Sequence, residues 1–403
     1  MRKLTITLGV IWVICTLTFA STQASTIAVT GQAAPGANGA RFRSFGAPSI
    51  NRKGDVAFKA GLSGGSAMSG IFVASGGQIL NVALSKDQDG KGTAAYFDFG
   101  DPVINDSGDV AFFGRTGNGM HITEGAVVLQ RGPNLVEIAR SGQPAPGTSG
   151  NFAELERHGL ALNNSGAVVF DATVSGTGSV EGIFSTSGNG VGPIVLSTDP
   201  RFGHFSGLAL NDAGQVAFVA VVRGAVPSTG AFLADSHGIR AVAAEGQIAS
   251  DGTQLGRLSS PSINDHGEIA FIDNEVSHGR FTSIDPKGVF VATGIGIQTI
   301  SKKNQAAPLL AGYFQHPIIV TPSAGNEAVI FRAADASGGS AVMVKTSTGL
   351  QPLVRNGDQA GSGSTYALIG SASLAPSGQF AFVARLNDKS GDVGLFRGTT
   401  ALQ

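Results

Sequence analysis

The sequence predicts an all-β fold: a seven-bladed β-propeller with four antiparallel strands per blade and a ring closed by the N-terminal strand. Two observations lead to this prediction. A repeat of roughly 54 residues occurs seven times, and each copy holds four short apolar runs separated by Gly, Asn, Asp and Ser. A third observation, explained below, is that the chain begins with a segment that resembles the end of a repeat.

The repeat is marked by a string of eight residues that ends in phenylalanine. Five copies begin with asparagine and two degraded copies begin with alanine. The copies are NRKGDVAF at Asn51, NDSGDVAF at Asn105, NNSGAVVF at Asn163, NDAGQVAF at Asn211, NDHGEIAF at Asn264, AGNEAVIF at Ala324 and APSGQFAF at Ala375. The closing phenylalanines are 48 to 60 residues apart. Seven such units fill the chain after its first two dozen residues.

Each string predicts a hairpin turn followed by a buried strand. In the segment 104–110, four turn-forming residues stand between two apolar runs. Asparagine can bond its own backbone two residues on, and glycine can take the left-handed conformation that closes such a turn. We therefore assign the repeated asparagine and glycine a structural role rather than a ligand role. The Val-Ala-Phe that follows is apolar on both faces, as required of a strand between two sheets.

The ends of the repeat array favour a closed ring over a β-helix. Four strands in each of seven repeats suit a propeller, whereas a β-helix has much shorter rungs and needs caps. The segment STIAVTGQAAPG from Ser25 resembles VEIARSGQPAPG from Val136, which ends a repeat. The last repeat stops soon after its third strand, near Phe396. We expect the N-terminal strand to complete blade seven and so to hide two sheet edges.

The first 24 residues have the form of a secretory signal peptide. Arg2 and Lys3 precede an apolar stretch over 4–19, and small residues follow as far as Ala24. The alternative is an uncleaved membrane anchor, for which this stretch is short. We thus predict a signal peptide over 1–24, a single propeller domain over 25–403, and a location in the periplasm or outside the cell.

Composition limits the partners of the exported chain. Cys15 is the single cysteine and Trp12 the single tryptophan, and both lie in the predicted leader. Without the leader there is no thiol for a disulfide or a thiolate metal site. The remaining 25 basic and 28 acidic side chains give a net charge of about −3, which offers no basic field to nucleic acid or an anionic membrane. We expect a monomer with no cofactor and no membrane span after cleavage.

Candidate ligand-binding residues lie in the links that lead into the inner strand of each blade. Propellers usually bind ligands at the central channel, and these links form one of its rims. The predicted rim residues are Asp101, Arg157, His158, His204, Arg257 and His316. Histidines and acids of this kind can bind a metal or an anionic sugar, but they can also simply be solvated. Their offsets from the repeat asparagine differ, so we predict no metal site, and no catalytic residue stands out.

The repeat also resembles a known group of proteins. The N-x-x-G-x-x-A-F string, with its trailing G-I-F and G-Q-x-A-P-G elements, resembles the NxxGxxAF tandem-repeat family of secreted bacterial proteins. The seventh copy, LAPSGQFAFVAR, resembles the repeat unit of TolB-type propellers. The chain departs from the family's pattern by lacking a C-terminal sorting helix and basic tail.

The resemblance implies an exported propeller and indicates no chemistry. Our leading hypothesis is a non-catalytic binding or scaffold protein whose ligand is a carbohydrate or an envelope protein. The alternative is a carbohydrate-active lyase or hydrolase that uses the channel rim.

Overall fold

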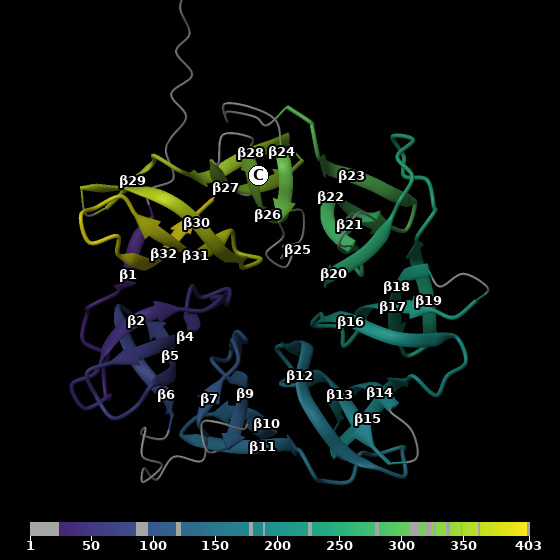
Figure 1. Cartoon of the computed structure of the whole chain (residues 1–403), viewed down its shortest axis with the longest axis horizontal. Coiled ribbons are helices and arrows are strands. Elements are labelled where there is room, and N and C mark those ends of the chain that lie inside the picture. Colours follow the sequence, from purple (N-terminus) through teal and green to yellow (C-terminus); the bar gives the residue numbers. More distant parts are fainter. Residues whose placement is uncertain are drawn as a thin grey trace, which may run out of the picture.

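The computed structural model describes residues 24–85, 96–117, 122–176, 180–187, 190–224, 228–278, 282–306, 314–318, 324–325, 328–335, 339–347, 349–361 and 363–400. These residues form strands and connecting turns, with no helix among them. Seven antiparallel sheets surround a central axis (Figure 1). The predicted seven-bladed β-propeller is therefore confirmed.

The blades follow one another in chain order, and each runs from an inner strand at the axis to an outer strand at the rim (Figure 1). Blade one contains β2 (Arg41–Phe45) with β3 (Ser49–Ile50), β4 (Val56–Ser63), β5 (Ser69–Ser75) and β6 (Gln78–Leu84). Blade two contains β7 (Asp98–Phe99) with β8 (Val103–Ile104), β9 (Val110–Gly117), β10 (Ile122–Arg131) and β11 (Asn134–Arg140). Blade three contains β12 (Asn151–Leu162), β13 (Val168–Ser175), β14 (Val180–Ser187) and β15 (Gly190–Leu196).

The remaining four blades repeat this order. Blade four contains β16 (Phe202–Leu210), β17 (Val216–Val222), β18 (Ser228–Asp235) and β19 (Gly238–Ala244). Blade five contains β20 (Arg257–Ile263), β21 (Ile269–His278), β22 (Thr282–Thr293) and β23 (Gly296–Lys302). Blade six contains β24 (Phe314–Ile318) with β25 (Ala324–Gly325), β26 (Ala328–Asp335), β27 (Ser340–Thr346) and β28 (Gly349–Arg355). Blade seven contains β29 (Gln359–Ala360), β30 (Ser364–Leu374), β31 (Gln379–Leu386), β32 (Val393–Thr399) and β1 (Ser25–Val29).

The repeated phenylalanines form the cores of the blades. All seven closing phenylalanines are buried, with no exposed surface. In blade one, Phe58 stacks on Phe72 of the next strand with ring centroids 5.7 Å apart, and Phe42 of the inner strand meets Phe72 edge-on at 5.2 Å. Each buried phenylalanine contributes roughly 1.5–3 kcal/mol by leaving water, and each aromatic pair about 0.5–1.5 kcal/mol more. The apolar string thus stabilises every blade in the same way.

The repeated asparagine has two structural roles, one inside its own turn and one between blades. The Oδ1 atom of Asn105 accepts hydrogen bonds from the backbone N–H groups of Ser107 at 3.0 Å and Asp109 at 2.9 Å. Its Nδ2 donates to the backbone C=O of Asn163, the same position in the next blade, at 3.1 Å. The same bridge joins Asn51 to Asn105, Asn163 to Asn211, and Asn211 to Asn264. The predicted structural role is confirmed, and the turns also hold blades one to five together.

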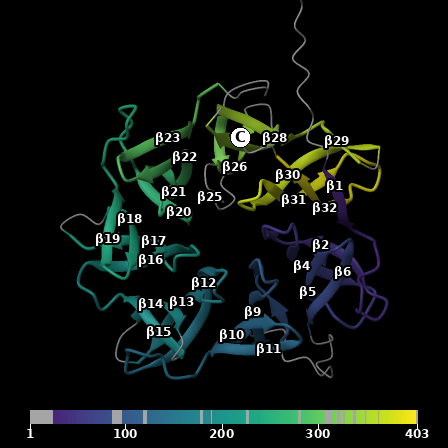
Figure 2. The ribbon, with the colours of Figure 1, turned by 180° about the vertical axis from the view of Figure 1, so that it is seen from behind.

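The N-terminal strand closes the ring as predicted. Strand β1 pairs antiparallel with β32, so the start and the end of the chain share blade seven (Figure 2). Ala28 of β1 is fully buried against Leu395. The hydroxyl of Thr30 adds a hydrogen bond of 2.8 Å to Asp392. The ring therefore depends on pairing across the whole length of the sequence.

The predicted leader lies almost wholly outside the described residues, which begin at Ala24. Its cleavage and the boundary at residue 24 stay predictions. Within the described part of the chain, no helix has the length and apolar character needed to cross a membrane.

Candidate functional site

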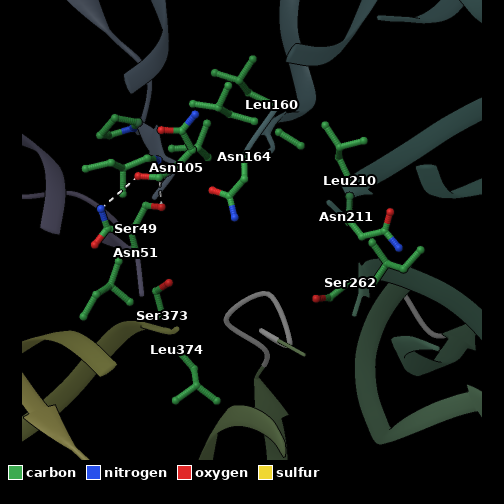
Figure 3. Close-up of a pocket in the computed structure, with 18 of the residues that line it drawn as sticks. Ser49, Asn51, Asn105, Leu160, Asn164, Leu210, Asn211, Ser262, Ser373 and Leu374 are labelled. Atoms are coloured by element: carbon green, nitrogen blue, oxygen red, sulfur yellow. Dashed lines mark hydrogen bonds between the residues drawn. The ribbon is translucent and has the colours of Figure 1, made fainter. Parts of the chain in front are cut away.

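A cavity of about 690 Å³ lies at the centre of the ring. Among the described residues, those that line it come from the inner strands and following turns of blades one to five and blade seven, with Phe113 of β9 in addition. Leu160, Leu210 and Leu374 supply apolar surface, while Ser262 and Ser373 supply hydroxyl groups that project toward the central space (Figure 3). The cavity is therefore the central channel, with both apolar and polar walls.

A ring of polar side chains stands where the inner strands end in their turns. It is formed by the residues that follow the repeat asparagines, namely Arg52, Asp106, Asn164, Asp212 and Asp265. The backbone N–H of each of the first four donates to the side-chain oxygen of the next, at 2.8 Å for Arg52 to Asp106 and 2.7 Å for Asp106 to Asn164. The bonds from Asn164 to Asp212 and from Asp212 to Asp265 measure 2.9 and 3.1 Å. We call these five residues the polar ring.

Arg52 spans the polar ring and is its single cation. Its guanidinium lies 2.9 Å from Asp265 and 3.5 Å from both Asp106 and Asp212. These pairs join blade one to blades two, four and five. Because the arginine side chain is 43% exposed, each pair contributes at most about 1 kcal/mol to stability. Together with Asp101, the described lining holds four carboxylates and one guanidinium, so its formal charge is −3.

Asp101 is the predicted rim residue that the structure places in this cavity. The residue keeps exposed surface, and the neighbouring blades remove part of the hydration of its carboxylate. This desolvation raises the pKa of Asp101, against the lowering effects of a backbone hydrogen bond at Ala47 and the charges of Lys59 and Arg115. The residue can therefore hold a proton at a higher pH than an ordinary aspartate.

The other predicted rim residues lie elsewhere or cannot be placed. His204 lies in β16, and its Nδ1 is 2.6 Å from Oε2 of Glu181 in blade three, a contact between blades. Arg257 is exposed at the start of β20. Neither belongs to the described lining of the channel cavity. The side chains of Arg157, His158 and His316 lie outside the described residues, although their backbones belong to β12 and β24. A role in ligand binding stays a prediction for all six.

Sequence reasoning missed the polar ring. It attributed the repeated turns to structure alone and did not consider the residue after each asparagine. The sequence did contain a pattern that indicates the polar ring, because the second residue of the repeated string carries a charged or amide side chain in five of the seven copies. A position that is polar in every intact repeat lies on one circle once the blades close into a ring.

A protein-family model matches the chain twice, over residues 13–198 and 178–401, and it describes a family of unknown function, DUF7453. The chain belongs to this family. The double match is expected of a tandem repeat, since each half of the ring presents similar strings. Membership of DUF7453 does not test the finer resemblance to the NxxGxxAF repeat family. Among curated proteins, no sequence match to this DUF7453 protein was found.

Solved structures confirm the fold. The β-propeller domain of the Trilobed protease from Pyrococcus furiosus aligns with a TM-score of 0.51 and 10% identity, over 89% of this chain and 93% of that chain. That domain is described as having an open velcro topology, whereas β1 here closes blade seven. Oligogalacturonate lyase from Vibrio parahaemolyticus aligns with a TM-score of 0.51 and 10% identity, over 94% and 98% of the two chains. At this identity the likeness concerns architecture alone.

Proposed function

We propose that this DUF7453 protein is an exported, non-catalytic binding or scaffold protein that takes its ligand in the central channel. The observation that carries the proposal is the cavity of about 690 Å³ with mixed apolar and polar walls. Its volume falls within the range of roughly 300–1,000 Å³ that is usual for sites of small ligands. We infer that the ligand is a carbohydrate or a projecting segment of an envelope protein.

A non-catalytic role agrees with the bonding of the polar groups. Asp106, Asp212 and Asp265 accept hydrogen bonds from neighbouring blades and pair with Arg52. Groups that hold the ring together are poorly suited to acid–base work, which needs a carboxyl group free to exchange a proton. Asp101, whose pKa is raised, has a property that suits an acid–base group, but it alone does not supply the pair of carboxyl groups that most glycoside hydrolases use.

The charge of the lining sets an expected preference among ligands. A formal charge of −3 attracts amines and accepts neutral hydroxyl groups, and it repels carboxylates and sulfates. The leucines add flat apolar surface against which a sugar face or an aliphatic side chain can pack. We therefore infer that neutral and basic saccharides bind in the channel more tightly than acidic ones.

A tryptophan placed in the channel tests the proposal. Trp12, the one natural tryptophan, lies in the predicted leader, so Ser373→Trp gives the mature protein a single tryptophan, beside the cavity, whose emission can be excited apart from that of the tyrosines (Figure 3). Ser236→Trp, on an exposed turn of blade four, is the matched control. Both variants are titrated with cellotetraose, a glucosamine tetramer and tetragalacturonate.

We expect the emission of the Ser373→Trp protein to change with the neutral or the basic tetramer and that of the Ser236→Trp protein to stay constant. A silent channel variant, or an equal response of both variants, contradicts a saccharide ligand in the channel. Export is tested separately, by measuring the mass of the protein recovered from the periplasm or medium. A mass that includes residues 1–24 contradicts signal cleavage.

A further inference from the structure

A second cavity, of about 420 Å³, opens between blades one and two. Arg43 and Ser44 of β2 and Lys59 of β4 line it on the side of blade one, and Asp98 of β7 lines it on the side of blade two. Asp101 lines both this cavity and the central channel, so the two spaces adjoin. We call this second cavity the interblade cleft.

Gly61 of blade one lines the interblade cleft at a position where the other blades have side chains. A Cβ atom on Gly61 would lie 2.5 Å from Oγ of Ser44, too close for any real contact. Gly61 stands three residues after the closing phenylalanine of its repeat. The equivalent residues in blades two to seven are Arg115, Thr173, Val221, Asn274, Ala334 and Arg385. The space is therefore a local feature of this blade and not a product of the repeat.

The carboxylate of Asp98 is saturated with donors. Oδ2 of Asp98 lies 3.0 Å from Nζ of Lys59 and 3.0 Å from a guanidinium nitrogen of Arg115, and Oδ1 accepts a bond of 2.8 Å from Ser69. Partial burial acts to raise the pKa of Asp98. Hydrogen bonds from the Phe99 backbone, Lys59 and Ser69 outweigh it and hold this pKa below its usual value. Asp98 is thus ionised and already neutralised by its neighbours.

Arg43 has no such partner. Its side chain is exposed in the cleft, and among the described residues it makes no ion pair. Its Nε lies 3.8 Å from the point where a Cβ of Gly61 would stand, and the hydroxyl of Ser44 lies 2.5 Å from the same point, so the guanidinium and this hydroxyl both border the glycine. Within the lining of the cleft, Arg43 and Lys59 balance Asp98 and Asp101 in formal charge, and Lys59 already pairs with Asp98. The cleft therefore offers an anion the guanidinium of Arg43, which no described carboxylate occupies, whereas the channel lining is acidic.

We propose that the interblade cleft binds the carboxylate of a hydroxylated acid, such as a uronic acid residue. The planar guanidinium of Arg43 matches a carboxylate with two parallel hydrogen bonds. The hydroxyl of Ser44 and the carboxyl group of Asp101 can exchange hydrogen bonds with hydroxyl groups next to that carboxylate. The proposal goes beyond the channel function and does not depend on it, because Arg43, Ser44 and Gly61 do not line the channel and Asp101 is the one described residue that the two linings share.

Isothermal titration calorimetry with sodium glucuronate tests the proposal. Glucose serves as the probe that lacks the carboxylate, and acetate as the probe that lacks the hydroxyl groups. We expect glucuronate to bind the full mature protein more tightly than either probe. Arg43→Gln removes the guanidinium, and Gly61→Val fills the cleft without changing its charge. Each should weaken glucuronate binding at least tenfold. Arg240→Gln, an exposed arginine on β19, is the matched control and should bind as the parent does.

Salt gives an independent readout, since binding at an exposed guanidinium should weaken as ionic strength rises. Circular dichroism shows whether each variant keeps its fold. Because the side chain of Arg43 is exposed, we expect Arg43→Gln to fold even if Gly61→Val does not. The proposal is overturned if glucuronate binds no better than glucose, or if folded Arg43→Gln binds it as tightly as the parent protein.

Discussion

Replacing Asn105 by alanine should weaken the ring, and the structure gives the size of the effect. Asn105 is 4% exposed, and its side chain satisfies the N–H groups of Ser107 and Asp109 as well as the C=O of Asn163. In Asn105→Ala the buried N–H of Asp109 loses its partner, which costs about 1–3 kcal/mol. The N–H of the exposed Ser107 can bond water instead, and the carbonyl of Asn163 keeps its hydrogen bond from Gly166. The loss of these two bonds to Asn105 therefore lowers the free energy of unfolding by less.

The total loss is about 2–3 kcal/mol. Blade seven shows that the variant can still fold, because Ala375 occupies the same repeat position. Its turn closes through backbone bonds alone, from Ala375 to Gln379 at 2.8 Å and from Gly378 to Ala375 at 2.9 Å. With roughly 2.1 cal/mol/K of unfolding entropy per residue over 403 residues, the melting temperature should fall by about 3 °C.

Equilibrium urea unfolding at 25 °C, followed by far-ultraviolet circular dichroism, measures this loss. Asn134→Ala, on an exposed asparagine at the start of β11, is the control and should change stability by less than about 0.5 kcal/mol. If Asn105→Ala is as stable as the control, the bonds of the repeat asparagine do not stabilise the ring, and the reasoning above is wrong.

Two further predictions concern single side chains in blades five and seven. Asp273 is fully buried at a position where the other blades carry alanine or glycine, and desolvation raises its pKa. Protonated Asp273 therefore favours the folded state, and the stability that this protonation contributes is lost as the pH rises through the raised pKa. Asp273→Ala should accordingly match or exceed the parent in melting temperature, by a margin that grows as the pH rises from the usual aspartate pKa through the raised one. A clear loss of stability above the raised pKa would argue that the pairing of Asp273 with Lys287 outweighs burial. On the closing strand, Ala28→Asp places a charge in the core and should cost more than about 3 kcal/mol in urea unfolding. The exposed Thr26→Asp should cost less than about 0.5 kcal/mol, and equal losses would contradict the closure by β1.

The two cavities together suggest how one ligand could use this face of the ring. The channel lining is acidic and the interblade cleft offers the exposed guanidinium of Arg43, while Asp101 belongs to both. A saccharide of mixed charge is complementary to both spaces at once. Binding of such a ligand should depend on Arg43 and on the channel, and the variants described above separate the two contributions.

The sequence by itself determined the elements whose causes are local or repeated. The phenylalanine of each string is buried because its strand is apolar on both faces, and Asn105 closes its turn through atoms two and four residues away. The pairing of β1 with β32 was also predictable, because Ser25 begins a segment that resembles the end of a repeat. Contacts of this kind follow from pattern alone, since equivalent residues in a repeat meet equivalent neighbours.

Only the tertiary structure decided which side chains meet at the centre. Arg52 reaches Asp265, 213 residues later in the chain, because closing the ring brings the turns of distant blades onto one circle. Counting back from the repeat asparagine does not show which residues of an inner strand face the channel, because β12 shifts register between Phe152 and Leu155 and again before Leu160. Each shift changes the side of the strand to which the following residues point. The channel and the cleft therefore depend on bulges and ring closure, which the pattern of the repeat does not encode.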